Sequence, residues 1–155
     1  MSSDKKTLLT ALGIPLGVGI LGTLLSGGTQ LSEDWIPPPL LPPGWLFPIV
    51  WTGLYLLMGY ASWLIWTSNA PKTQKRQALL LYGLQLLANF LWPVLFFGTE
   101  SLAGSLVCVL LLWVLILLSI GAFSRILPKA GDLLLPYILW VSFATYLNLG
   151  FFLLN

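Results

Sequence analysis

Five long apolar runs divide this sequence, and they constrain its fold more than any other feature. They span approximately residues 7–25, 47–66, 77–97, 102–123 and 133–154. A helix of about 20 residues is about 30 Å long, which matches the hydrocarbon thickness of a bilayer. Because lipid offers the backbone no hydrogen bonds, each run must be helical. The sequence predicts an all-α integral membrane bundle of five transmembrane helices, forming a single domain over residues 1–155.

The charged residues separate the runs and indicate their orientation. They make up only 8% of the chain, against roughly 25% in a typical soluble domain, which excludes a soluble globular protein. All seven Lys and Arg residues precede the first run, lie between the second and third, or lie between the fourth and fifth. The positive-inside rule therefore predicts a cytoplasmic N-terminus, with the first loop and the C-terminus outside.

The composition also excludes several kinds of chemistry. The chain has no His and one Cys, Cys108, so a disulfide, a zinc cluster or a His-based catalytic dyad cannot form within it. The net charge of +2 provides no broad basic surface for nucleic acid. We therefore expect no metal site, no nucleic-acid partner and no conventional catalytic residue.

Three of the runs carry a stripe of aromatic and polar side chains. Spacings of three or four residues place each stripe on one helical face. The stripes comprise Trp51, Tyr55, Met58, Ser62 and Trp66; Tyr82, Gln85, Asn89, Trp92 and Phe96; and Trp140, Phe143, Ala144, Leu147, Asn148 and Phe151. Because polar groups in lipid are costly, such positions are informative. We expect the stripes to converge in the half of the bundle below the first loop.

Two interpretations of these stripes remain open. The amides of Gln85, Asn89 and Asn148 could simply hydrogen-bond one helix to another. Alternatively, they could line a pocket, and Pro93, which cannot donate to the carbonyl of Asn89, is expected to kink the third helix beside it. An aromatic, sparsely polar cavity suits a flat, mostly apolar ligand with a few polar edges.

The loop over residues 29–45 is stiffened by five prolines. Such a loop favours extended conformations, and it could form a lid over the bundle or a rigid connector. In the first run, Gly13 and Gly17 form a G-x-x-x-G spacing that permits close helix contact within or between subunits.

Three extended motifs then suggest a family. They are Pro42-Pro43-Gly44-Trp45-Leu46-Phe47 with Trp51-Thr52-Gly53-Leu54-Tyr55 and Met58-Gly59; Gln85-Leu86-Leu87-Ala88-Asn89-Phe90-Leu91-Trp92-Pro93 with Phe96-Phe97-Gly98; and Pro136-Tyr137-Ile138-Leu139-Trp140-Val141-Ser142-Phe143-Ala144-Thr145-Tyr146-Leu147-Asn148. In this order they are similar to the PPxWxF…WTxLYxxMG, QLxLNxxWxxxFFG and PYLxWVxFAxxLN segments of the TspO/MBR family. The chain thus resembles the tryptophan-rich sensory proteins related to the mitochondrial translocator protein.

The resemblance implies a usually dimeric membrane protein that binds porphyrins, such as protoporphyrin IX or haem, as a sensor or carrier in porphyrin homeostasis and stress regulation. No obligatory cofactor is implied; membrane lipids and a second copy are the other expected partners. The family's pocket positions correspond to Trp51, Asn89, Trp92, Trp140, Phe143, Ala144 and Leu147, and the stripes add Tyr55, Gln85, Phe96 and Asn148. The lid positions are Trp35, Pro42, Pro43 and Trp45.

The resemblance also implies two alternative functions. Some bacterial members oxidise protoporphyrin IX in light with the tryptophans that match Trp51 and Trp140. Lipid or sterol transport is the other alternative, but residues 147–155 contain neither the Tyr nor the base of the animal cholesterol motif. The chain departs from the family at Pro48-Ile49, where Gly-Pro is usual, and at Leu40, where Trp is usual. Trp35-Ile36-Pro37-Pro38 is a candidate shifted copy of this Trp element.

Overall fold

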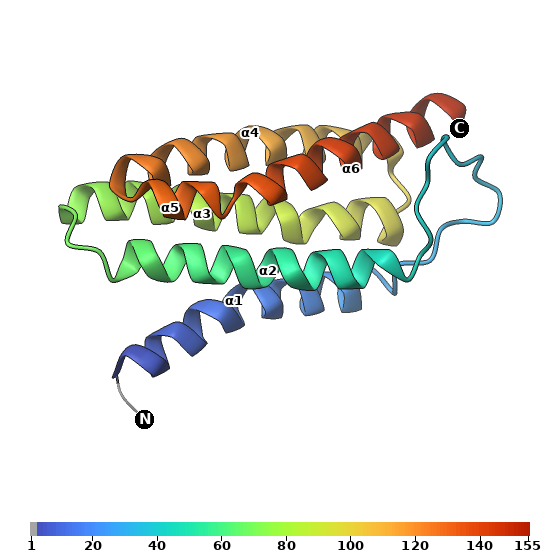
Figure 1. Ribbon diagram of the computed structural model, residues 1–155. Helices are drawn as coiled ribbons and strands as arrows, with labels where there is room; N and C mark the ends of the chain where they lie inside the picture. The colour runs from blue at the N-terminus through green and yellow to red at the C-terminus, as the bar shows by residue number, and fades with distance from the viewer. Residues whose placement is uncertain (1–2) are drawn as a thin grey trace.

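The computed structural model describes residues 3–155, and these form an all-helical bundle (Figure 1). Its elements are α1 (Ser3–Leu25), α2 (Leu46–Trp66), α3 (Lys72–Pro93), the π-helical segment η1 (Val94–Gly98), α4 (Leu102–Ile126), the short α5 (Pro128–Asp132) and α6 (Leu135–Leu154). Five helical segments are long and apolar enough to cross a membrane: α1, α2, α3 with η1, α4, and α5 with α6. The predicted fold class is therefore confirmed.

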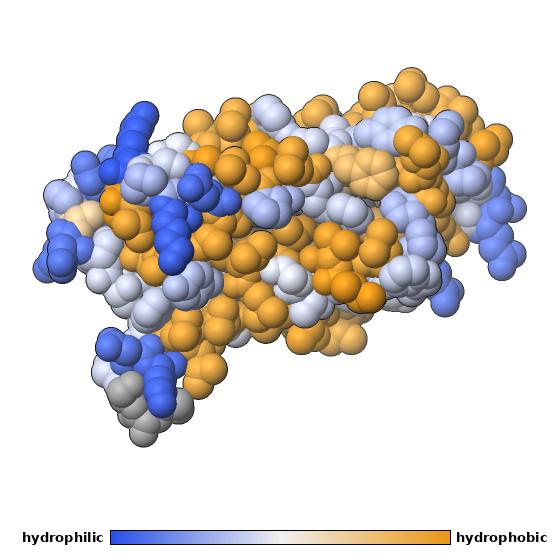
Figure 2. Space-filling model, in the orientation of Figure 1, coloured by the Kyte–Doolittle hydropathy of each residue, from blue (hydrophilic) through white to orange (hydrophobic). Residues whose placement is uncertain are grey.

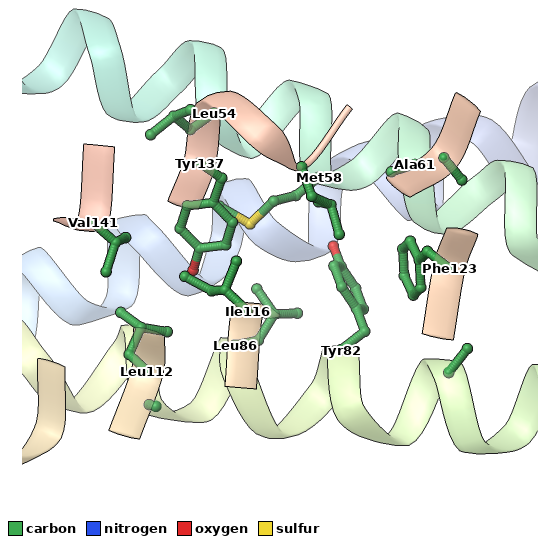
Figure 3. Close-up of a cluster of buried hydrophobic side chains, with 14 of the residues drawn as sticks. Leu54, Met58, Ala61, Tyr82, Leu86, Leu112, Ile116, Phe123, Tyr137 and Val141 are labelled. Carbon is green, nitrogen blue, oxygen red and sulfur yellow. The ribbon is translucent and has the colours of Figure 1, made fainter. Parts of the chain in front are cut away.

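The helices pack in two groups. The α4 helix packs along α3 and α6, while α1 packs along α2 and α3. In contrast, the backbones of α2 and α6 are held apart, so side chains must fill the space between them. Figure 3 shows Met58 of α2, Tyr82 of α3 and Tyr137 of α6 projecting into one cluster of buried side chains, which also includes Ile116 of α4.

Charged side chains lie at the ends of the bundle, and apolar side chains cover the surface between them. The start of α1, the α2–α3 connection and the α4–α5 region lie at the same end (Figure 1), and all seven Lys and Arg residues belong to these segments. Figure 2 shows hydrophilic side chains at both ends and hydrophobic ones between them. This distribution is that of an integral, multi-pass membrane protein. The cytoplasmic position of the basic end stays a prediction.

The third helix begins at Lys72, not at about Gln77. Pro71 occupies its N-cap with an extended backbone, and the first turns carry Lys72, Lys75 and Arg76. The apolar run marked the lipid-crossing part, whereas the helix itself continues into the polar boundary. Long basic side chains permit this extension because their stems cover apolar surface while the charge reaches water.

Pro93 marks a change in helix type. It is the last residue of α3, and the wider turn of η1 follows at Val94–Gly98. The backbone N–H of Thr99 donates to the carbonyl of Val94 at 2.9 Å, across the π-helical segment. Ser101 then accepts from the N–H of Gly104 at 3.1 Å and caps α4. The disturbance expected at Pro93 is thus taken up by a π-helical turn, a common response to an interrupted α-helix.

Candidate functional site

The three striped helices are joined by a chain of buried hydrogen bonds. The Tyr55 hydroxyl of α2 donates to Oδ1 of Asn89 at 3.0 Å. Nδ2 of Asn89, on α3, donates to the Tyr137 hydroxyl of α6 at 2.8 Å. That hydroxyl in turn donates to Oε1 of Gln85 at 2.6 Å. Gln85, Asn89 and Tyr137 are all buried, so this polar chain connects three helices away from water.

Tyr137 is the central residue that sequence reasoning missed. It lies three residues before Trp140 and seven before Ala144, so it falls on the stripe assigned to the last helix. Its position next to Pro136 in the third motif was a second signal. Because the predicted stripe begins at Trp140, it does not include the Tyr137 phenol, which accepts from Asn89 and donates to Gln85.

A second set of hydrogen bonds holds the third predicted amide. The Trp92 indole N–H donates to Oδ1 of Asn148 at 2.9 Å. Nδ2 of Asn148 donates to the backbone carbonyl of Leu102 at 3.3 Å. This set connects α3, α6 and the start of α4. All three amides thus bond between helices in the way the helix-to-helix interpretation requires.

Aromatic rings fill the gap between α2 and α6, and we call the residues Phe47, Trp51, Tyr137, Trp140 and Phe143 the α2–α6 seam. Ring centroids lie 5.7 Å apart for Phe47–Trp140 and 6.3 Å apart for Trp51–Tyr137. Trp140 also lies 5.7 Å from Phe143. These distances are typical of favourable aromatic pairs. All of the seam except Tyr137 is half-buried, so its outer edge reaches the surface of the bundle.

One polar group in the seam has no hydrogen-bond partner among the described residues. Nε1 of Trp140 is buried, and no acceptor for it lies within the described residues. The indole nitrogens of Trp92 and Trp113 do have partners, Asn148 and the Ser142 hydroxyl at 2.8 Å. Trp63, at the other end of α2, also has an unpartnered nitrogen. A buried donor without an acceptor costs about 1–3 kcal/mol, a cost that an acceptor on a ligand would remove.

The first loop lies over one end of the bundle and is anchored to α6. The Ile36 N–H donates to Oδ1 of Asn155 at 2.9 Å, and Nδ2 of Asn155 donates back to the Ile36 carbonyl at 3.1 Å. The Tyr146 hydroxyl donates to the Pro39 carbonyl at 2.8 Å. Pro38 packs so closely on Gly150 that a Cβ there would lie 2.4 Å from the Pro38 ring.

Among the predicted lid residues, Trp35 lies inward and Trp45 does not. The Trp35 ring lies 5.4 Å from Phe96 and 5.6 Å from Phe151, and Phe96 stacks on Trp92 at 4.9 Å. Trp45 is 67% exposed at the start of α2. Pro43 is exposed and Pro42 half-buried. Leu40, also exposed, has a φ of 68°, a value uncommon outside glycine.

The predicted residues therefore fall into three neighbouring groups. Trp51, Trp140 and Phe143 belong to the seam, and Trp92, Phe96 and Asn148 lie under the loop. The polar chain of Tyr55, Gln85 and Asn89 connects α2, α3 and α6. Ala144 and Leu147 are buried on the same α6 helix. Phe47 was also missed, because a residue at a helix start gives little signal of the direction it faces.

Such a fold and interior define a five-span, all-helical membrane protein whose uncharged core is rich in tryptophan, tyrosine and amides. The model of the TspO/MBR family matches residues 11–154, and the chain belongs to this family.

Relatives from bacteria and mammals agree with the family assignment. The chain is 37% identical to the tryptophan-rich protein TspO of Chlorobaculum tepidum, over 100% of this chain and 99% of that protein. It is 35% identical to the tryptophan-rich sensory protein of Cereibacter sphaeroides, over 96% and 89% of the two chains. It is 36% identical to the translocator protein of Bos taurus, over 92% and 83%.

Proposed function

We propose that the α2–α6 seam binds a porphyrin, and that the protein acts as a membrane tetrapyrrole sensor or carrier. The unpartnered Nε1 of Trp140 is the observation that carries this proposal. A porphyrin offers a flat apolar face to pack on the rings of Trp51 and Trp140, and its unprotonated ring nitrogens and π face can accept the indole N–H. Membership of a family with relatives named sensory and translocator proteins supports the same class of function.

Charge determines how the ligand lies. The buried polar residues of the described bundle are serines and amides, without a charged side chain, so nothing there neutralises a carboxylate. Burying an unpaired charge is costly. The macrocycle therefore occupies the seam, and its carboxylates lie towards the first loop and water. Phe47 and Trp51, which begin α2 directly after that loop, are on this side of the seam.

Trp140→Phe tests the proposal directly. It keeps a ring in the seam but removes the unpartnered donor, so protoporphyrin IX should bind about tenfold more weakly, which corresponds to about 1.4 kcal/mol. The thermal stability of the free protein should change little, because removing the unpartnered donor offsets the packing lost with the smaller ring. Fluorescence quenching during titration and a melting curve measure the two effects.

Trp113→Phe is the matched control, because its indole N–H is satisfied by Ser142 on the α4–α6 surface. It should leave porphyrin affinity unchanged and slightly lower the stability. Equal affinity of the Trp140 variant and the unmodified protein would contradict a seam site.

Metal-free protoporphyrin IX should bind at least as tightly as haem. The chain has no His, which is the commonest axial ligand of haem iron. The Cys108 thiol is on α4 and donates to the carbonyl of Ala88 at 3.4 Å, away from the seam. Parallel titrations of the two ligands measure the ratio, and a strong preference for haem would show that iron ligation contributes to binding.

A homodimer is part of the same proposal. At Gly13 and Gly17 of α1, no described atom beyond the chain neighbours and the surrounding helix backbone lies within 4 Å of where a Cβ would be, whereas Gly59 of α2 packs against Leu12. The G-x-x-x-G face is therefore not used inside the bundle. Its open side suits close contact with a helix of a second copy.

A further inference from the structure

A groove at the Lys- and Arg-rich end of the bundle has no part in the proposed porphyrin site. It has a volume of about 650 Å³ and is formed where α2 ends and α3 begins. Its lining is Trp66, Lys72, Lys75, Arg76, Leu79 and Leu80. We propose that this groove binds one anionic phospholipid, with the phosphate on the basic residues and an acyl chain along the leucines.

One lysine of the groove forms a hydrogen bond between its two walls. Nζ of Lys75, on α3, donates to the backbone carbonyl of Trp66 at 3.0 Å. This carbonyl is at the C-terminal end of α2, where cations are favoured by the helix dipole. Lys75 is half-buried. It holds α2 against the first turns of α3, and the groove follows from this contact.

The other two cations are available to a ligand. Lys72 and Arg76 are exposed and lie four residues apart, on one face of α3. Within residues 3–155 no hydrogen bond or ion pair holds either side chain. The carboxylates at this end, Asp4 and Asp132, belong to α1 and α5. The positive end of the α3 dipole adds to the attraction for an anion.

The remaining lining residues favour a lipid over a water-soluble anion. Leu80 is 63% exposed and Trp66 is 61% exposed, and both belong to membrane-spanning helices near their polar ends. Exposed Trp at that depth is typical of the headgroup boundary. Leu79 and Leu80 follow the basic first turns of α3 and continue the lining of the groove into the apolar part of this helix. Basic residues above an apolar wall match a phosphate joined to an acyl chain.

The test is native mass spectrometry of the full chain in neutral detergent with added phosphatidylglycerol or phosphatidylcholine. The unmodified protein should retain one phosphatidylglycerol and release phosphatidylcholine. In K72Q/R76Q the affinity for phosphatidylglycerol should fall about 25-fold, because each basic residue beside an anionic headgroup contributes a factor of about five. Glutamine preserves helix propensity, and Lys75 is retained, so the α2–α3 contact should persist.

The double variant R125Q/K129Q is the matched control. It removes two exposed cations from the same end of the bundle but lies outside the groove, and it should keep the bound lipid. R76K, which keeps the charge, should bind nearly as well as the unmodified protein.

Three results would overturn the proposal. Retention of the lipid by K72Q/R76Q would show that the groove is not its site, and equal loss in both double variants would show only a general charge effect. Full displacement by millimolar inorganic phosphate would indicate a simple anion site. None of these outcomes bears on the seam, so the porphyrin proposal is tested separately.

Discussion

Replacing Asn89 with leucine should lower both porphyrin affinity and bundle stability by more than any other single change in the seam region. The amide accepts from Tyr55 and donates to Tyr137, so leucine removes two hydrogen bonds between three helices. The Tyr55 hydroxyl then lacks an acceptor, a cost of about 1–3 kcal/mol. Tyr55 loses the hydrogen bond that fixes its ring beside Trp51, and Tyr137 keeps only its bond to Gln85, so we expect affinity to fall more than tenfold. Quenching titrations and thermal melts measure the two effects, and circular dichroism should still show a helical bundle.

Ser142→Ala is the control for this experiment. It removes another hydrogen bond between helices, from Trp113 of α4 to α6, but on an exposed part of the bundle. It should cost some stability and leave porphyrin affinity unchanged. If Asn89→Leu lowered stability alone, Asn89 would hold helices together and have no effect on the ligand site.

Gly150→Ala should open the first loop and speed ligand release. The new Cβ would lie 2.4 Å from Cβ of Pro38 and 3.0 Å from its Cγ, and a proline ring cannot rotate away. Overpacking of this kind costs about 1–3 kcal/mol, which raises the population of the open loop by between about 5-fold and 150-fold. We expect faster hydrogen exchange at Ile36, whose N–H is held by Asn155, and a matching rise in the porphyrin dissociation rate measured by stopped flow.

Gly121→Ala makes the same chemical change where the Cβ meets nothing within 4 Å. That variant should be as stable as the unmodified protein or slightly more so, because alanine favours helix, and its release rate should not change. Faster exchange at Ile36 with unchanged release would show that the loop does not gate the site.

The fold could be predicted from sequence because lipid permits so few structures. A run of apolar residues must become a helix in a bilayer, so five runs specify five spans. The ends of the helices could be predicted less accurately, because hydropathy marks the boundary of the lipid and not that of the helix. The α3 helix therefore starts at Lys72, within the basic segment that hydropathy assigned to a loop.

The burial of the candidate site's amides was predictable, but their hydrogen-bond partners were not. The stripe pattern identified Gln85, Asn89 and Asn148 as inward-facing, and all three are buried. Which partner each amide finds depends on the rotation and depth of the neighbouring helices, and a periodicity does not contain that information. The same limit explains why Trp35 and Trp45, equal candidates by type, differ in exposure: Trp35 is half-buried and Trp45 is exposed.

The separation of α2 and α6 has a consequence for how affinity is measured. Because the half-buried rings of the seam reach the surface of the bundle, a lipophilic ligand can exchange with the site through the bilayer as well as past the loop. Its relevant concentration is then the amount dissolved per volume of membrane, which its partition coefficient determines. The apparent dissociation constant should rise in proportion to the lipid or detergent present, and only values expressed as a mole fraction of the membrane will agree between preparations.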